Sequence, residues 1–185
     1  MAEQTKPSSA VVIAHEADGL GGQITSHLEA RGFLVDTHVV VPDTDEPNQA
    51  TPFPEFGDYD IVVLMGSIRS LTNKDEISSW VYEELDRIRT AHEAQQPILG
   101  ICFGGQLIAE ALGGSVGPSD TEIGWYEIDP VSNQDQHPNQ PGAGPWMEWH
   151  HDRFEPPPGA EVLATTPAAN PVSYTHLTLP TTPYV

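Results

Sequence analysis

The only cysteine of the chain, Cys102, lies in the stretch GICFGG at residues 100–105, between an apolar run and a predicted helix. Gly100 and Gly104 flank it, and Gly-x-Cys-x-Gly is the pattern of a nucleophile on a tight turn between a strand and a helix. The N-terminus of the following helix favours the thiolate, which is the attacking form of a cysteine. The backbone N–H of Phe103 is positioned to donate to an oxyanion. We therefore predict that Cys102 is a nucleophile; the alternative is an inert, buried cysteine.

A cysteine nucleophile needs a base, and histidine is the usual one. Four histidines are considered as the base: His15 lies at the first turn, His27 and His92 lie on predicted helices, and His38 lies in a predicted strand. We expect them to be surface or packing residues. Four candidate metal ligands lie close together in the sequence: Glu148, His150, His151 and Asp152. Adjacent residues on a strand point to opposite faces, so this group does not easily converge on one ion, and we predict no metal site.

The elements that would hold Cys102 alternate between strands and helices. Short apolar runs predict four strands, at residues 10–15, 33–41, 59–66 and 97–101. Apolar residues at helical spacing predict three helices, at residues 22–32, 75–94 and 103–114. This alternation is typical of an α/β fold with a doubly wound, mostly parallel sheet and helices on both faces. Such sheets bind ligands at the carboxyl ends of their strands, and Cys102 follows the fourth strand.

The pattern changes after residue 114. Residues 122–130 predict an edge or antiparallel strand, and residues 146–154 and 160–166 predict further short strands. Residues 131–145 have no apolar periodicity and predict a mobile loop. The regular alternation of strand and helix therefore does not continue to the end of the chain.

Composition limits the class of protein. The chain has 185 residues, which fits one domain with a full-sized core. Its net charge of -20 argues against nucleic acid and anionic membranes as partners, because both need basic patches. No apolar run approaches the ~20 residues of a membrane span, and the polar N-terminus lacks the apolar core of a signal peptide. A single cysteine permits no internal disulfide, so we expect a cytoplasmic protein.

Four stretches of the sequence resemble one family. GICFGGQLIAEALGG at residues 100–114 resembles the nucleophile turn of class I glutamine amidotransferases, especially the free-standing proteins similar to the amidotransferase domain of GMP synthase. Three more stretches are similar to that family: DYDIVVLMGSIRSL at 58–71, EIGWYEI at 122–128 and EWHHDRFEPPPGAEVLATT at 148–166. The resemblance covers about residues 10–170 and implies a flavodoxin-like α/β fold.

The resemblance also implies a reaction and a set of roles. In the family a cysteine thiolate attacks the side-chain amide of L-glutamine, a histidine shuttles the proton, ammonia leaves, and water releases glutamate from a γ-glutamyl thioester. The backbone around Gly66 and Ser67 would give a second oxyanion donor, and Gln106 would lie near the bound glutamine. Three residues would lie near the active site without acting as the base: Trp149, His150 and Asp152. No cofactor is implied, and ammonia would pass to an acceptor on a synthase domain or partner protein.

The sequence departs from the family at its end. The family's histidine and glutamate lie in a motif of the type His-Pro-Glu after the last strands, and no such motif follows residue 170. Residues 172–185, VSYTHLTLPTTPYV, instead resemble a translated sequencing-library adapter. We therefore predict a polar tail at 1–9, a truncated amidotransferase-like domain at 10–170 and a non-native tail at 171–185. Residues 172–185 would have no structural role, and this chain would be inactive because the triad is incomplete.

Two other functions stay open. A γ-glutamyl peptide hydrolase uses the same cysteine, histidine and turn with water as the only acceptor, and the sequence does not distinguish the two enzymes. A non-catalytic member acting as a binding or regulatory module is the third interpretation. The presence of Cys102 argues against it.

Overall fold

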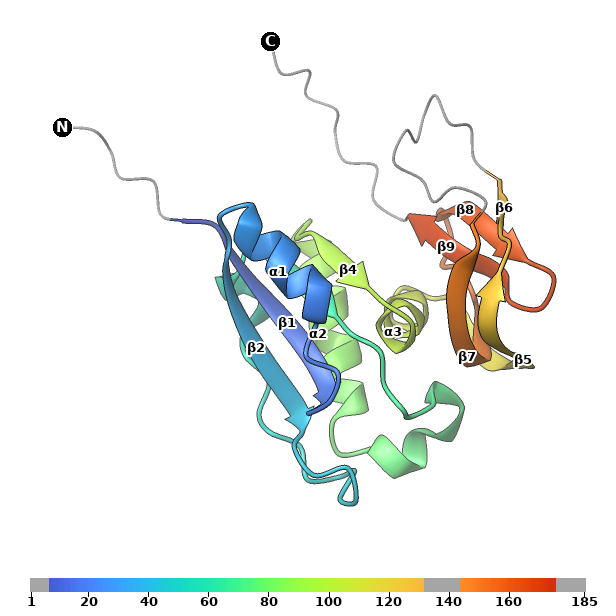
Figure 1. The fold of residues 1–185 in the computed structure, drawn as a ribbon. Helices are drawn as coiled ribbons and strands as arrows, with labels where there is room; N and C mark the ends of the chain where they lie inside the picture. The colour runs from blue at the N-terminus through green and yellow to red at the C-terminus, as the bar shows by residue number, and fades with distance from the viewer. Residues whose placement is uncertain (1–6, 132–143, 176–185) are drawn as a thin grey trace, which may run out of the picture. The chain divides into compact units, whose positions relative to one another are not determined.

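The computed structural model describes residues 7–131 and 144–175 of the chain. The chain divides into two compact units, Met1–Ala111 and Leu112–Val185. Figure 1 colours the first unit from blue to yellow-green and the second from yellow to red. The boundary between the units falls close to residue 114, where the sequence pattern changes.

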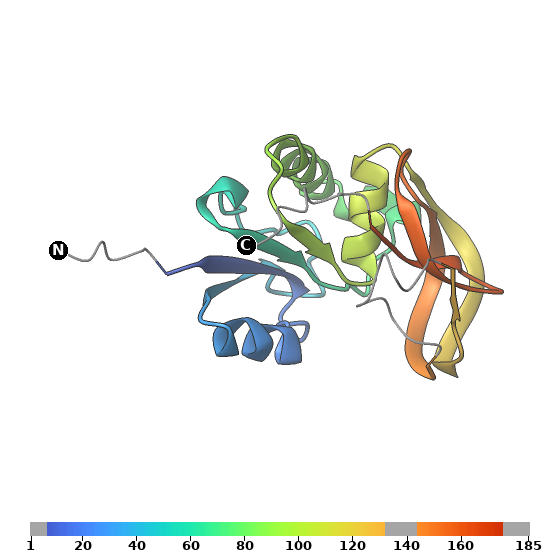
Figure 2. The ribbon, with the colours of Figure 1, turned by 90° about the horizontal axis from the view of Figure 1, so that it is seen from above.

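The first unit is built on a four-stranded parallel sheet in the order β2-β1-β3-β4. Its strands are β1 (Ser9–Glu16), β2 (Leu34–Val41), β3 (Ile61–Leu64) and β4 (Ile98–Gly100). Its α-helices are α1 (Gly22–Ala30), α2 (Val81–Glu93) and α3 (Phe103–Ala111). Figure 2 shows α1 on one face of the sheet and α2 on the other, where α2 packs against α3. The predicted α/β fold with a parallel sheet and helices on both faces is confirmed.

The core of this unit lies on both sides of the two central strands. Every residue of β1 from Ala10 to Ala14 is fully buried, as is every residue of β3 from Val62 to Leu64. Both faces of a parallel sheet are covered by helices, so its central strands are apolar throughout rather than alternating. The predicted apolar face of α2 is buried, including Val81 and Ile88. No helix among the described residues is long and apolar enough to cross a membrane.

The helix predicted for residues 75–94 is shorter in the structure. Residues Leu71–Ile77 form a separate 3₁₀ segment, η2, and α2 begins only at Val81. The intervening residues bond to a distant loop: the Ser79 N–H donates to the Asn48 side chain, and the Trp80 indole N–H donates to the Pro47 carbonyl. These bonds tie residues 79 and 80, between the end of η2 and the start of α2, to the loop at 47–48. Their partners lie about thirty residues away, so helical spacing alone could not predict them.

The second unit consists of antiparallel strands. β5 (Ser115–Tyr126) pairs with β7 (Trp146–Glu155), with an irregularity between Pro118 and Glu122. A three-stranded sheet has the order β6-β8-β9 and comprises β6 (Asp129–Pro130), β8 (Glu161–Thr166) and β9 (Asn170–Thr175). The strands predicted at 146–154 and 160–166 are confirmed. The strand predicted at 122–130 is divided between β5 and β6, and most of the loop predicted at 131–145 lies outside the described residues.

The last described residues correct one expectation from the sequence. Residues 172–175 were expected to have no structural role, but they belong to β9, and Ser173 to Thr175 pair with β8 in antiparallel register, with Tyr174 opposite Val162. The Tyr174 ring packs against Phe154 of β7 at 5.0 Å between centroids, and burial raises the pKa of its phenol. A valine, a tyrosine and a threonine suit a half-buried strand, which is why this segment can extend the sheet. Residues 176–185 lie outside the described residues.

Candidate functional site

Cys102 sits on a tight turn between β4 and α3 with its side chain exposed. Its φ of 53° lies in the left-handed region, which costs free energy in a residue that has a Cβ. Helix bonding starts at this residue, since the Gln106 N–H donates to the Cys102 carbonyl over 3.1 Å. Backbone strain of this kind occurs where the surrounding structure holds a side chain in one place, often for function. The predicted turn at Cys102 is therefore present.

The two glycines of the Gly-x-Cys-x-Gly pattern let α3 approach the sheet. A Cβ on Gly104 would lie 2.2 Å from the Leu64 carbonyl oxygen, and one on Gly100 would lie 2.6 Å from backbone atoms of Gly104. No side chain fits at either position. The Gly104 N–H also donates to the Met65 carbonyl over 3.1 Å, which ties the start of α3 to the end of β3. These contacts fix the turn that carries Cys102.

The turn after β3 lies beside the cysteine. A Cβ on Gly66 would lie 3.6 Å from the Cys102 Cβ and 4.0 Å from its Sγ. The next residue, Ser67, donates from Oγ to Glu16 over 2.7 Å and accepts from the Arg69 N–H over 3.0 Å. The structure thus places Gly66 beside Cys102. The oxyanion role of the Gly66 and Ser67 backbone stays a prediction.

The two remaining predicted residues of this unit, Phe103 and Gln106, are on α3 and buried. The Phe103 ring lies 4.8 Å from the His15 ring and 6.3 Å from the Trp80 ring, centroid to centroid. The Phe103 side chain therefore anchors the turn of Cys102 to the core. The oxyanion role predicted for Phe103 concerns its backbone N–H instead. Gln106 is 6% exposed, and its predicted place near the bound substrate stays a prediction.

A buried histidine and glutamate lie behind the Gly66 turn, and sequence reasoning did not connect them. His15, at the end of β1, and Glu84, on α2, are both 0% exposed. His15 Nε2 lies 3.2 and 3.3 Å from the two carboxylate oxygens of Glu84, and Nδ1 lies 3.2 Å from the Gly66 carbonyl oxygen. His15 was expected to be a surface or packing residue; it is packed, and it is also hydrogen-bonded at both nitrogens. The one local sign was a His-Glu pair ending an otherwise apolar strand.

The ring of His15 is best described as protonated. The Gly66 carbonyl oxygen can only accept, so Nδ1 donates to it, and an ionised Glu84 accepts from Nε2. Burial by itself lowers the pKa of His15, but the charge and hydrogen bond of Glu84, together with the Gly66 carbonyl, raise it above its ordinary value. Removing either partner would leave the other charge buried and unpaired.

The other three predicted residues, Trp149, His150 and Asp152, lie on β7 in the second unit. His150 Nε2 lies 3.0 Å from a carboxylate oxygen of Glu122, which also accepts from the Thr166 hydroxyl over 2.9 Å. Trp149 is on the opposite face of the strand and is 67% exposed. The predicted nearness of these residues to Cys102 stays a prediction.

The metal hypothesis concerns the same strand. Among residues 7–131 and 144–175, no group of three histidine, cysteine, aspartate or glutamate side chains could hold a metal ion. His150 bonds to Glu122, whereas the neighbouring His151 bonds to the Thr121 hydroxyl. Burial raises the pKa of Glu148, which lies 4.0 Å from His150 Nε2.

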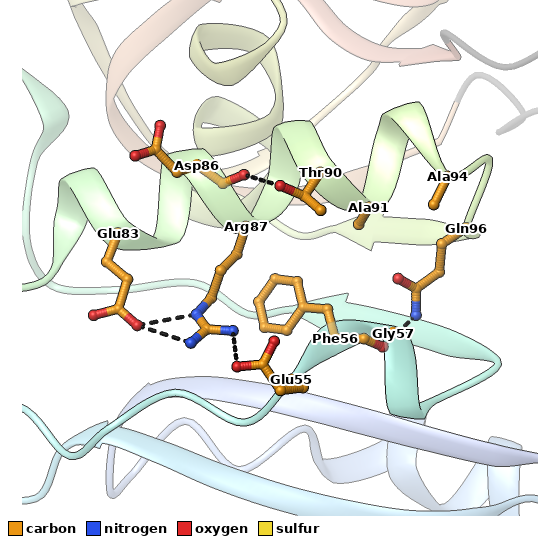
Figure 3. Close-up of a pocket in the computed structure, with 10 residues that line it drawn as sticks. All are labelled: Glu55, Phe56, Gly57, Glu83, Asp86, Arg87, Thr90, Ala91, Ala94 and Gln96. Carbon is orange, nitrogen blue, oxygen red and sulfur yellow. Dashed lines mark hydrogen bonds and ion pairs between the residues drawn. The ribbon is translucent and has the colours of Figure 1, made fainter.

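A pocket of about 440 Å³ lies elsewhere in the first unit, between η1 (Phe56–Asp58) and α2. Figure 3 shows Arg87 at its wall, fixed by ion pairs with Glu83 and Glu55. Its lining residues immediately precede β3 and β4, whereas Cys102 follows β4. The pocket is thus at the amino ends of the strands, the edge at which sheets of this class do not bind their main ligands.

Known proteins are similar to this chain in sequence and in fold. Residues 18–182 match the family model described as "Glutamine amidotransferase class-I". The chain is 44% identical over 63 residues to the glutamine amidotransferase-like protein chry6 of Gibberella zeae. The aligned region is 33% of this chain and 26% of that protein. It is 35% identical over 158 residues to one of the subunits of the glutamine-hydrolyzing GMP synthase of Natronomonas pharaonis, which covers 80% of this chain and 73% of that protein.

A solved structure extends the likeness. A crystal structure of a glutamine amidotransferase from Thermotoga maritima superimposes with a TM-score of 0.79 over 93% of this chain and 73% of that chain. The two sequences are 22% identical, so this superposition shows a shared fold. The chain spans about a quarter of the length of chry6 and about three quarters of the archaeal relative.

Proposed function

Because this chain belongs to the class I glutamine amidotransferase family, we propose that it is built for the glutaminase half-reaction, with Cys102 as the nucleophile. The thiolate attacks the side-chain amide carbon of L-glutamine, the C–N bond breaks, and ammonia leaves with the added proton. Water then cleaves the γ-glutamyl thioester, which gives glutamate and restores the thiol. The observation that carries this proposal is the left-handed φ of 53° at an exposed Cys102 beside Gly66.

The neighbours of Cys102 have distinct roles in this proposal. The Phe103 N–H and the backbone around Gly66 and Ser67 stabilise the oxyanion of the tetrahedral intermediate, as preorganised donors do in acyl transfer. Gln106 helps to hold the substrate from α3. From the resemblance to the family, we also propose a role near the glutamine for three residues of β7: Trp149, His150 and Asp152. The chemistry needs no cofactor, since the thiol, a base and water supply every step.

The base is the part of the proposal on which this sequence departs from the family. No His-Pro-Glu motif follows residue 170. General acid–base catalysis contributes typically ~10²–10⁴-fold to a rate, so we expect these 185 residues to turn over glutamine very slowly. Attack of Cys102 on an activated substrate analogue needs less help from a base and is the better assay.

The relatives suggest where the ammonia goes. The archaeal relative is named as a subunit of a glutamine-hydrolyzing GMP synthase. We infer by analogy that this chain passes ammonia to an acceptor on a synthase partner. The single cysteine suits a reducing compartment, so we place the protein in the cytoplasm.

The test measures alkylation of Cys102 by a glutamine-like chloroketone and by iodoacetamide. The ratio of the two rates, here called the selectivity, is compared with that of a free thiol such as glutathione. We expect the chain to exceed the free thiol by about tenfold or more, because an oxyanion donor accelerates attack on the ketone only. L-glutamine should protect Cys102 from the chloroketone, and L-asparagine should not. A selectivity equal to that of glutathione, without protection by glutamine, would contradict the proposed function.

A further inference from the structure

The buried pair of His15 and Glu84 is unusual because it places two ionisable side chains in the core of the first unit. Both side chains are 0% exposed, and the His15 ring is packed between aromatic rings, 4.8 Å from Phe103 and 5.6 Å from Trp80. Burying an ion pair is often no more stabilising than an apolar pair of the same size. The stability gained by packing therefore does not explain why His15 and Glu84 are buried together. The hydrogen bonds of the pair suggest another role.

The bonds of His15 converge on the turn beside the cysteine. Glu84 holds Nε2 from α2, which orients the ring so that Nδ1 faces the Gly66 carbonyl at 3.2 Å. Gly66 in turn lies against Cys102. The Phe103 ring, next to Cys102 in the chain, packs edge-on against the imidazole. The buried His15 side chain thus contacts both Gly66, which lies beside Cys102, and Phe103, which follows Cys102 in the chain.

The adjacent residue makes a second bond to the same turn. Glu16 accepts from the Ser67 hydroxyl over 2.7 Å and is 3% exposed. β1 therefore ends in two polar residues that hold two consecutive residues of the β3 turn. Glycine at position 66 gives that turn no side chain of its own to fix its peptide, so outside bonds must set its orientation.

We propose that His15, oriented by Glu84, is a positioning residue that fixes the Gly66 peptide for oxyanion stabilisation beside Cys102. His15 does not touch the substrate and transfers no proton. The inference rests on the proposed function, since it assigns a support to the oxyanion turn of that same site. It predicts that the bond from Nδ1 to Gly66, rather than the packing of the ring, controls the reactivity of Cys102 toward carbonyl compounds.

The test uses two single variants of the 185-residue chain that keep different halves of the His15 contacts. In His15→Asn the amide nitrogen takes the place of Nδ1, so the donor to Gly66 remains and the contact with Glu84 is lost. In His15→Gln the amide reaches the place of Nε2, so the contact with Glu84 remains and the donor to Gly66 is lost. Each variant is the control for the other.

The readout is the selectivity of Cys102 for the glutamine-like chloroketone over iodoacetamide. The chloroketone forms a tetrahedral adduct with an oxyanion before chloride leaves and a thioether remains, whereas iodoacetamide reacts by direct displacement of iodide. Loss of one oxyanion donor typically costs ~10²–10³-fold, and a loosened turn keeps part of that, so we expect His15→Gln to lower the selectivity about tenfold. His15→Asn should keep it within about twofold, with the iodoacetamide rate unchanged in both variants.

Two results would overturn the inference. Either His15→Gln keeps the parent selectivity, or His15→Asn loses it to the same extent. If the buried charge of Glu84 unfolds either single variant, both substitutions are measured with Glu84→Gln, and the tenfold loss is expected for His15→Gln/Glu84→Gln but not for His15→Asn/Glu84→Gln. A parent chain that is no more selective than glutathione would overturn the proposed function and this inference together. A selective parent whose selectivity does not change with substitutions of His15 would overturn this inference alone.

Discussion

At the scale of single residues, Cys102 holds a backbone conformation that costs free energy in any residue except glycine. Its φ is 53°, and the close packing of α3 against β4 at Gly100 and Gly104 holds the turn in this conformation. The left-handed conformation costs a residue with a Cβ about 1–2 kcal/mol. The exposed thiol is therefore held in place at the expense of stability, which is common at functional sites.

The strain predicts an order of stability for two variants of this position. Cys102→Gly should be more stable than Cys102→Ala by about 1 kcal/mol, because glycine adopts a positive φ without the clash of a Cβ. Both variants remove the thiol, so they differ in strain rather than in chemistry. Chemical denaturation of the two proteins measures the difference. An alanine variant as stable as the glycine variant would show that the turn is not strained.

His15 predicts a pH dependence of stability. Its pKa is raised in the folded protein, where Glu84 and the Gly66 carbonyl outweigh the effect of burial, so the folded state binds the proton more tightly than the unfolded state. Its contribution is complete below the unfolded pKa of about 6.5 and is lost as pH rises through the folded pKa. Between pH values of about 5 and 6.5 the parent should exceed His15→Asn/Glu84→Gln in melting temperature by its widest margin.

That margin should shrink at higher pH. The double variant lacks both titrating groups of the buried pair, so it serves as the baseline at each pH. The charge of the adjacent Glu16 also favours the protonated form of His15, and Glu16 is present in both proteins. A margin that is constant with pH would mean that folding does not raise the pKa of His15, and a margin that grows with pH would mean that folding lowers it.

At the scale of elements, α3 packs against the sheet near two adjacent glycines, and the space for a side chain differs sharply between them. A Cβ on Gly104 would clash with the Leu64 carbonyl at 2.2 Å, whereas one on Gly105 meets nothing closer than 3.6 Å. We expect Gly104→Ala to destabilise the protein by about 3 kcal/mol and to slow alkylation of Cys102. Gly105→Ala, one position along the same helix, should be neutral or stabilising by up to about 1 kcal/mol. Thermal unfolding of the pair decides; equal midpoints would disprove the proposed seating of α3.

The sequence predicted those parts of the fold that depend on local pattern. Burial on both faces makes β1 and β3 continuous apolar runs, and burial on one face gives α2 apolar residues at helical spacing, so the sequence shows both. The nucleophile turn was visible because Gly100 and Gly104 stand at fixed positions around Cys102. Bonds between distant segments were not visible: Trp80 to Pro47 moved the start of α2, and His15 to Glu84 joins residues 69 positions apart.

At the scale of the whole molecule, the residues at the nucleophile turn come from three separate segments of the first unit. The end of β1 supplies His15, the turn after β3 supplies Gly66, and the turn after β4 supplies Cys102. All three positions are at the carboxyl ends of parallel strands, the edge where sheets of this class bind ligands. A parallel sheet brings its strand ends together at one edge, so a few residues per strand suffice to build a site.

The last stretch of the chain is where sequence and structure make opposite predictions about the whole molecule. Resemblance to an adapter predicts that a chain ending at Pro171 is as stable as the full chain. The structure predicts a loss, because Ser173 to Thr175 pair with β8 and the Tyr174 ring packs against Phe154 at 5.0 Å. The family match, which runs to residue 182, also includes this stretch. An aromatic pair and its buried area contribute about 1–2 kcal/mol, which in a chain of this size lowers the melting temperature by about 5 °C.

A chain ending at Thr175 keeps β9 and is the matched control for that deletion. We expect its melting temperature to equal that of the full chain, because every strand pairing of the described residues is retained. The informative comparison is between the chains that end at 171 and at 175. If both melt together with the full chain, β9 does not contribute to stability and residues 172–185 are not part of the domain. If only the shorter chain melts early, the four residues from Val172 to Thr175 are part of the fold, whatever the origin of their sequence.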